Sequence, residues 1–167
     1  SGKNICYGNP NANILIIAGN ATDVKEEQDY LESIIDNSSI NKSDIFVVHS
    51  VNCICKRKSG DNLVSRDPAL AELNNCLPFV KYAIQFVRPR IIISMGATAL
   101  NQFYPQYKFL DYIGETVSYD GIKAIITYSV NDLFILSERI DSEKVEELVY
   151  QTIDSFSEAQ NYINIIK

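Results

Sequence analysis

The segment from Arg88 to Leu100, which reads RPRIIISMGATAL, constrains the fold more than any other part of the chain. Its three consecutive isoleucines, Ile91 to Ile93, are β-branched and show no polar alternation, which indicates a strand buried on both faces. Strands of this kind belong to parallel sheets that helices cover on both sides. Gly96 and a helix start at Ala97 follow directly. The carboxyl edge of the sheet therefore meets a helix amino-terminus, a corner at which open α/β sheets bind ligands.

Three further apolar runs, at residues 14–18, 45–51 and 122–128, repeat this pattern along the chain. Segments with helical periodicity separate the runs, which predicts right-handed crossovers between parallel strands. We therefore predict a three-layer α/β/α sandwich around a mainly parallel four-stranded sheet. The loops that follow the four strands should open at one edge of that sheet, and we expect any functional site there.

Length and composition limit the classes of protein that remain. The 167 residues predict a single domain spanning residues 1–167, either complete or a piece of a larger protein. No apolar run approaches the roughly 20 residues that cross a bilayer, so we expect a cytoplasmic protein without membrane contact. The net charge of −6 argues against tight nucleic-acid binding through bulk charge.

The segment from residue 56 to residue 66 is basic, in contrast to the negative net charge of the chain. Lys56, Arg57 and Lys58 form a basic run, and Arg66 follows shortly after. Such a run is compatible with a solvated loop and with a loop that contacts phosphates, so both interpretations stay open. These cations are candidate nucleic-acid-binding residues.

The four cysteines, Cys6, Cys53, Cys55 and Cys76, show neither a C-x-x-C pair nor the regular spacing of a secreted disulfide framework. We therefore expect reduced thiols. A metal site built from all four is the alternative, although zinc ligands usually come in closer pairs.

Three motifs along the chain resemble those of one known family. Residues 8–12, GNPNA, precede the first apolar run; residues 65–68, SRDP, are followed by Glu72 and Cys76; and residues 88–100 supply the third motif. In order and spacing they resemble the motifs of the uracil-DNA glycosylase superfamily, most closely its iron–sulfur-containing family 4. The resemblance covers most of the chain and implies the fold of that superfamily.

The resemblance also implies where the chemistry of uracil removal would lie, and two of those positions have changed. The family positions the attacking water with a carboxylate and stabilises the departing uracil with a histidine. Asn20 stands at the first position and Ser129 at the second. An amide orients water but takes no proton from it, and a hydroxyl is a shorter donor than an imidazole. Asp23 is either a substitute acid or a cap of the next helix.

Two features that read the base in the family have changed as well. His49, the only histidine, stands where the family has an asparagine that pairs with uracil. It either contacts a base or phosphate or is a half-buried loop residue that the backbone satisfies. The loop that carries a stacking aromatic residue in the family is shortened, and Tyr30 fits a helix face better than a stacking position.

The resemblance implies an iron–sulfur cluster, but the ligand pattern is incomplete. Cys53 and Cys76 align with the last two ligands of the family, whereas no C-x-x-C pair precedes Gly8. We therefore expect no metal site, no cluster and no other cofactor.

The water-positioning acid, the leaving-group histidine, the uracil-reading asparagine and the stacking loop have all changed together. We interpret the chain as a catalytically degenerate glycosylase-like domain, not an enzyme, with a structural, recruiting or accessory role in DNA replication or repair. Viral and phage replication systems use glycosylase folds in such roles, which favours a viral or phage origin and, for a eukaryotic virus, a nuclear or virus-associated location. The acidic charge favours a protein partner, with DNA binding weakly.

Two other functions stay open at this stage. One is an active but divergent glycosylase for uracil or a damaged base, in which Asn20 holds the water and Ser129 or His49 assists departure. The other is a DNA-binding module without chemistry that uses His49, Arg66 and the basic run from Lys56 to Lys58.

Overall fold

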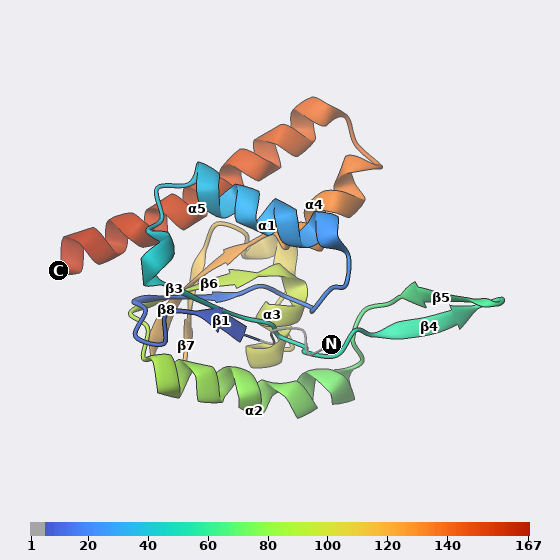
Figure 1. Ribbon diagram of the computed structural model, residues 1–167, viewed down its shortest axis with the longest axis horizontal. Helices are drawn as coiled ribbons and strands as arrows, with labels where there is room; N and C mark the ends of the chain where they lie inside the picture. Colours follow the sequence, from blue (N-terminus) through green and yellow to red (C-terminus); the bar gives the residue numbers. More distant parts are fainter. Residues whose placement is uncertain (1–5) are drawn as a thin grey trace.

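A six-stranded sheet between two layers of helices forms the body of the protein (Figure 1). The computed structural model describes residues 6–167. The strands are β1 (Cys6–Gly8), β2 (Ile14–Ile17), β3 (Ile45–Val48), β4 (Lys56–Ser59), β5 (Asn62–Ser65), β6 (Ile91–Met95), β7 (Thr116–Tyr119) and β8 (Ile122–Thr127). The helices are α1 (Lys25–Asn37), α2 (Leu70–Val87), α3 (Gly96–Phe103), α4 (Val130–Ser137) and α5 (Ser142–Ile166), with short 3₁₀ helices η1 (Lys42–Asp44) and η2 (Phe109–Asp111).

The order of strands in the sheet is β1-β3-β2-β6-β8-β7, and the four central strands run parallel to one another. The predicted α/β/α sandwich with a mainly parallel sheet is confirmed. The strand number rises from four to six, because the short strands β1 and β7 pair antiparallel along the two outer edges. β7 joins β8 through Asp120 and Gly121, which both have the positive φ of a tight two-residue hairpin turn.

Alternate residues of the parallel strands belong to two separate hydrophobic clusters. In β2, Ile14 and Ile16 face one cluster and Leu15 and Ile17 face the other, and all four side chains are fully buried. In β6, Ile92 faces away from its two isoleucine neighbours in the same manner. No polar alternation is possible in such strands, because neither face of the sheet reaches water.

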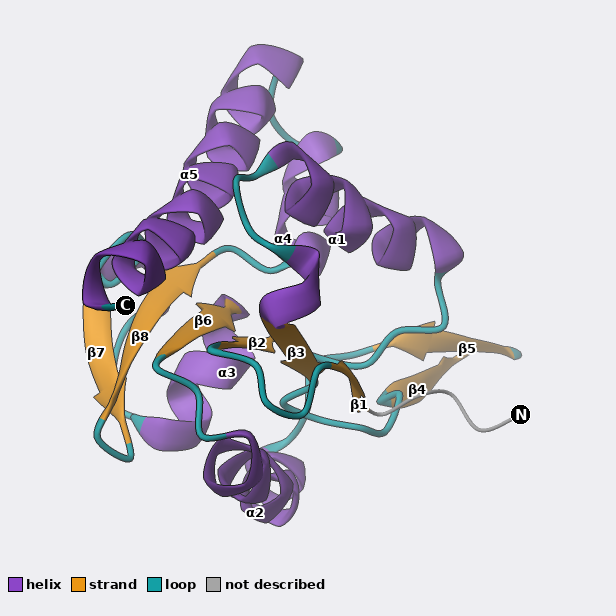
Figure 2. Ribbon diagram, turned by 60° about the vertical axis from the view of Figure 1, so that its left-hand side comes forward, coloured by secondary structure: helices purple, strands orange, loops and turns teal. Residues whose placement is uncertain are grey.

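The two helical layers cover opposite faces of the sheet. Figure 2 shows α1, α4 and α5 on one face and α2 and α3 on the other. Tyr30 on α1 packs edge-on against Phe134 on α4, with ring centroids 5.3 Å apart, which confirms its predicted place on a helix face. Within residues 6–167, none of these helices is both long and apolar enough to cross a membrane.

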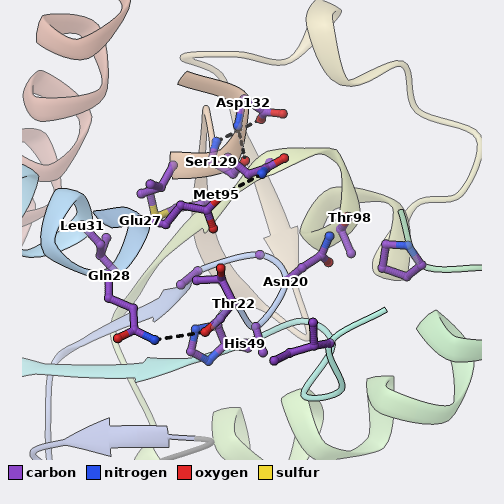
Figure 3. A pocket seen from close by; sticks show the side chains of 18 of the residues that line it. Asn20, Thr22, Glu27, Gln28, Leu31, His49, Met95, Thr98, Ser129 and Asp132 are labelled. Atoms are coloured by element: carbon purple, nitrogen blue, oxygen red, sulfur yellow. Dashed lines mark hydrogen bonds between the residues drawn. The ribbon is translucent and has the colours of Figure 1, made fainter. Parts of the chain in front are cut away.

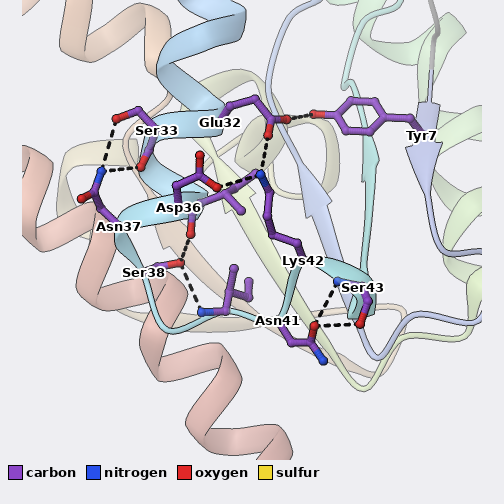
Figure 4. A network of polar contacts seen from close by, with 11 residues as sticks. Tyr7, Glu32, Ser33, Asp36, Asn37, Ser38, Asn41, Lys42 and Ser43 are labelled. Carbon is purple, nitrogen blue, oxygen red and sulfur yellow. Dashed lines mark hydrogen bonds and ion pairs between the residues drawn. The ribbon is translucent and has the colours of Figure 1, made fainter.

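A polar network ties the outer strand β1 to helix α1 (Figure 4). The hydroxyl of Tyr7 donates to the carboxylate of Glu32 at 3.4 Å. Lys42, in the 3₁₀ turn before β3, contacts Glu32 at 3.2 Å and Asp36 at 2.7 Å. Burial and the neighbouring Glu32 charge raise the pKa of Tyr7 to about 12, so its hydroxyl stays a donor at neutral pH.

The β4–β5 hairpin lies outside the main sheet and projects from the body of the molecule (Figure 1). Both interpretations of the basic run placed it in a loop, and that expectation was wrong. Lys56, Arg57 and Lys58 belong to strand β4, which pairs antiparallel with β5. Gly60, with a φ of 62°, and Asp61 form the two-residue turn between the strands.

Candidate functional site

A cleft with a volume of about 830 Å³ opens at the carboxyl ends of the four parallel strands (Figure 3). The loops after β2, β3, β6 and β8 contribute Asn20, His49, Gly96 and Ser129 to its wall. Residues of β1, of helices α1, α2, α3 and α4, and of the segment before α2 also line it. The four loops therefore open at one edge of the sheet, as predicted, and three of the candidate site residues meet there.

Ser129 lies against the residues that end β2 and β6. A Cβ atom at Gly96 would lie 2.9 Å from the Cβ atom of Ser129, and one at Gly19 would lie 3.6 Å from the same atom. Gly19 and Gly96 have φ angles of 79° and 85°, which glycine adopts without strain. The backbone at the ends of both strands thus packs closely against the Ser129 side chain, with no room for a larger residue at Gly96.

Ser129 is also the N-cap of α4. Its Oγ accepts a hydrogen bond from the backbone N–H of Asp132 at 3.1 Å, and its own N–H donates to the Asp132 carboxylate at 3.0 Å. This reciprocal pair is a capping box, which stabilises the start of a helix. Asp132 lines the cleft and was missed from the sequence, although the pattern Ser-x-x-Asp after the fourth strand is a sequence sign of such a box.

Asn20 occupies the cleft wall just after β2 (Figure 3). Its backbone extends the pairing of β2 and β3 through a bridge to Val51. The Oδ1 atoms of Asn20 and of Asn52, another residue of the wall, are buried and accept no hydrogen bond from any described residue. Such unpaired acceptors are rare and cost about 1–3 kcal/mol each. The side chain at the candidate water-positioning site, Asn20, is an amide. It has an acceptor available to orient a water molecule, but it takes no proton from that water.

Asp23 neither caps α1 nor lines the cleft among the residues described. Its carboxylate pairs with the Nζ atom of Lys56 at 3.1 Å. The N-cap of α1 is Val24, whose side chain makes no capping hydrogen bond. The expected Asp23 cap was wrong, because the helix begins one residue later than an Asp23 cap requires.

The candidate nucleic-acid-binding residues divide between two places. His49 lies half-buried in the cleft wall after β3 (Figure 3). The cations from Lys56 to Lys58 and Arg66 belong to the hairpin and its base, and none of them lines the cleft. The sequence suggested one nucleic-acid surface, whereas the structure separates the histidine from the basic residues.

Carboxylates dominate the charge of the cleft. Five of its residues are acidic, and none of its described residues is a lysine or an arginine; the acids are Glu27, Asp29, Glu32, Asp67 and Asp132. Lys25 and Lys42 pair with Asp29 and Glu32 at 2.8 and 3.2 Å. The other three have no cationic partner within residues 6–167. A cleft of this charge repels a phosphate backbone.

Arg66 is tied into an ion pair at the base of the hairpin. Its two terminal nitrogens each lie 2.7 Å from an oxygen of Glu72, and its Nε donates to the carbonyl of Lys56 at 3.3 Å. The Arg66 hydrogen bonds are the main reason that the pKa of Glu72 falls to about 2. Glu72 also accepts the N–H of Ala69 at 2.7 Å, which joins the pair to the first turn of α2.

The four cysteines do not assemble a cluster site. All are free: Cys6 and Cys53 are exposed, Cys76 is half-buried and Cys55 is buried. Burial raises the pKa of the Cys55 thiol, which disfavours the thiolate that binds metals. Within residues 6–167, no group of three or more histidine, cysteine or acidic side chains is arranged to hold a metal ion. These residues therefore do not fit the iron–sulfur cluster that the family 4 resemblance implies.

Comparison with known families identifies the superfamily to which this fold is similar. Residues 5–151 match the family model described as the uracil DNA glycosylase superfamily. The matched region contains the whole sheet, the cleft and the hairpin. No curated protein matches the chain.

Proposed function

This chain belongs to the uracil DNA glycosylase superfamily, and on that premise we propose that it is a module which has kept the glycosylase fold and lost the excision reaction. Its role is structural or recruiting, in DNA replication or repair, with a protein as its main partner. It acts as a single domain and without an iron–sulfur cluster or other cofactor.

The state of Ser129 is the observation that carries this proposal. Excision needs a donor aimed at the uracil oxygen on which negative charge gathers, and losing one such donor typically costs about 10²–10³ in rate. The Ser129 Oγ accepts the N–H of Asp132 as the N-cap of α4, which fixes the side chain beside the ends of β2 and β6. Its own O–H is therefore a short donor whose position is set by the helix cap and not by a leaving group. It is placed to begin α4 rather than to reach a leaving group.

Asn20 supports the same conclusion, because it stands where the family activates the attacking water. A general base contributes about 10²–10⁴ in rate because it removes a proton from the attacking water. The Asn20 amide removes none, and it adds no negative charge beside a sugar that becomes cationic. Asp23, the nearest acid in sequence, is paired with Lys56.

The charge of the cleft adds a third argument. A glycosylase must bring the phosphates on both sides of its target nucleotide close to the cleft mouth. Here Glu27, Asp67 and Asp132 line the cleft with no cation among its described residues. Phosphates would approach against repulsion, so catalysis would be disfavoured before any chemical step.

A group of exposed aromatic residues on α2 supports a protein partner. Phe79, Tyr82 and Phe86 are 64%, 65% and 58% exposed, and the rings of Tyr82 and Phe86 stack with centroids 6.0 Å apart. Clustered exposed aromatic residues are typical of protein contact surfaces. Together with the net charge of −6, this surface favours recruitment of a protein over tight DNA binding.

A single-turnover excision assay tests the loss of the reaction. Protein in excess is incubated with labelled oligonucleotides that contain uracil opposite guanine, uracil opposite adenine, or uracil in a single strand, and abasic sites are read by alkaline cleavage. We expect no cleavage above the protein-free control, with an active uracil-DNA glycosylase as the positive control. Excision that Asn20→Ala abolishes would overturn the proposal and establish a divergent active enzyme.

A further inference from the structure

The β4–β5 hairpin, residues 56–65, is anchored to the body of the protein at its base. An isolated two-stranded ribbon is marginally stable in water, so a projecting hairpin needs anchors. Arg66 supplies one through its double contact with Glu72 on α2, and Lys56 supplies another through Asp23 before α1. A backbone bond of 3.0 Å from the N–H of Arg66 to the carbonyl of Cys55 continues the pairing below the ribbon. We refer to residues 56–65 as the arm.

Two cations of the arm take no part in the ion pairs that anchor it. Arg57 and Lys58 are exposed and have no ion-pair partner within residues 6–167. The only acid of the arm is Asp61, in its turn. In an acidic protein, an exposed ribbon on which cations outnumber carboxylates indicates a surface that meets an anion.

The register of the arm places positive charge on both of its faces. Lys58 pairs with Leu63, and Lys56 with Ser65, so these lysines share one face. Arg57 pairs with Val64 and projects from the other face. Cations on both faces suit a ribbon that lies between two rows of anions.

The dimensions and composition of the arm favour double-stranded DNA. Each strand of the arm has four residues, which gives a ribbon about 10–14 Å long. The major groove of duplex DNA admits a two-stranded ribbon of this kind. Residues 56–65 contain no aromatic side chain on which the bases of a single strand could stack. The arm therefore offers phosphate contacts without base stacking.

We propose that the arm binds the phosphates of duplex DNA through Arg57 and Lys58, while Lys56 and Arg66 hold it in position. The arm rises from the rim of the cleft, because Ile54 and Asp67, on either side of it in sequence, both line the cleft. DNA held by the arm would thus lie beside the cleft and away from its carboxylates. This inference goes beyond the proposed function and does not depend on the loss of excision.

Fluorescence anisotropy with a labelled 25-base-pair duplex tests the proposal. At low salt we expect weak binding in the micromolar range, with log K falling by about 2 per unit of log salt, as for two phosphate contacts. The double variant Arg57→Glu/Lys58→Glu should weaken binding at least tenfold and bring the salt slope close to zero. Arg57→Gln/Lys58→Gln should give a smaller loss and lower the salt slope in the same direction.

A matched control variant distinguishes an effect of the arm on DNA binding from an effect of the protein's net charge. Arg90 directly precedes β6, at the end of that strand opposite to the cleft. Lys167 follows α5, and the C-terminal end of α5 lies across the molecule from the arm (Figure 1). Both are exposed, and Arg90→Glu/Lys167→Glu makes the same change in net charge. We expect this variant to bind within about twofold of the wild type.

Four results would overturn the proposal. They are no duplex binding at low salt, equal losses in the two charge-reversed variants, tighter binding of a single strand of equal length, and equal displacement of the duplex by polyglutamate. Equal displacement by polyglutamate would indicate that the arm binds an acidic protein and not DNA. The excision assay is read on separate products, so failure of this proposal is distinguishable from failure of the proposed function.

Discussion

The cleft and the arm lie side by side, yet they differ in charge and in how they are built. The cleft is formed by the ends of the central strands, contains unpaired carboxylates and has its Ser129 hydroxyl engaged in capping α4. The arm stands outside the sheet and presents the exposed cations Arg57 and Lys58. The acidic cleft and the cationic arm are thus two neighbouring surfaces of opposite charge, one built by the central sheet and the other by an appended hairpin.

A pair of glycine substitutions should show the largest difference between these two regions. Gly96 in the cleft and Gly60 in the arm both have positive φ, but a Cβ at Gly96 would lie 2.9 Å from Ser129, whereas one at Gly60 meets nothing within 4 Å. Gly96→Ala should cost about 2–4 kcal/mol from strain and overpacking together. Gly60→Ala should cost about 1 kcal/mol from strain alone.

Thermal unfolding measures both substitutions. For a chain of this size we expect Gly96→Ala to lower Tm by about 5–15 °C and Gly60→Ala by no more than about 4 °C. Equal shifts would show that the strand ends do not close on Ser129 as described.

A smaller effect is expected at the helix cap of the cleft. Ser129→Ala removes the oxygen that accepts the N–H of Asp132 and should cost about 1 kcal/mol, a fall of about 2–4 °C in Tm. Ser59→Ala is the matched change in the arm, where the exposed hydroxyl has no hydrogen-bond partner among the described residues, and it should leave Tm almost unchanged. If Ser129→Ala left Tm unchanged, the capping role would be wrong.

The smallest effect concerns the anchor of the arm. The folded pKa of Glu72, about 2, lies below its ordinary value of 4.5, so the Arg66–Glu72 pair stabilises the fold fully above about pH 4.5 and loses that contribution as the pH falls towards 2. Glu72→Gln should therefore be less stable than the wild type at pH 7, and the difference should shrink between pH 4.5 and 2. Both side chains are about one-third exposed, which keeps the effect small.

Denaturant unfolding across this pH range checks the anchor. Asp61→Asn serves as the control, because Asp61 is an exposed acid of the arm without an ion pair among the described residues. A difference between Glu72→Gln and wild type that stayed constant from pH 7 to pH 2 would contradict the Arg66–Glu72 anchor.

The sequence predicted the central sheet well because the buried strands have a strong local signal. Ile14 to Ile17 and Ile91 to Ile93 are apolar without interruption, and each became a parallel strand with both faces buried. Gly96 was correctly placed at a corner of the sheet, where its positive φ is required. The edge strand β1 was missed because its three residues are all exposed and show no apolar alternation.

The arm and the charge of the cleft were harder to predict, for different reasons. The arm is a polar ribbon, so its strands lack the apolar pattern that marks a strand in a core, and its basic run was placed in a loop. The carboxylates of the cleft come from α1, α4 and the segment before α2, and they meet only when these elements pack. Asp132 alone had a local signal, its place in the capping box with Ser129.

One uracil-containing duplex, followed by two readouts in the same reaction, tests the central claim most directly. With protein at a concentration that saturates the anisotropy signal, we predict that the duplex is bound through Arg57 and Lys58 and that no abasic sites accumulate. Accumulation of abasic sites in the wild type, and its loss in Asn20→Ala, would contradict the account, because the cleft would then still carry out the excision.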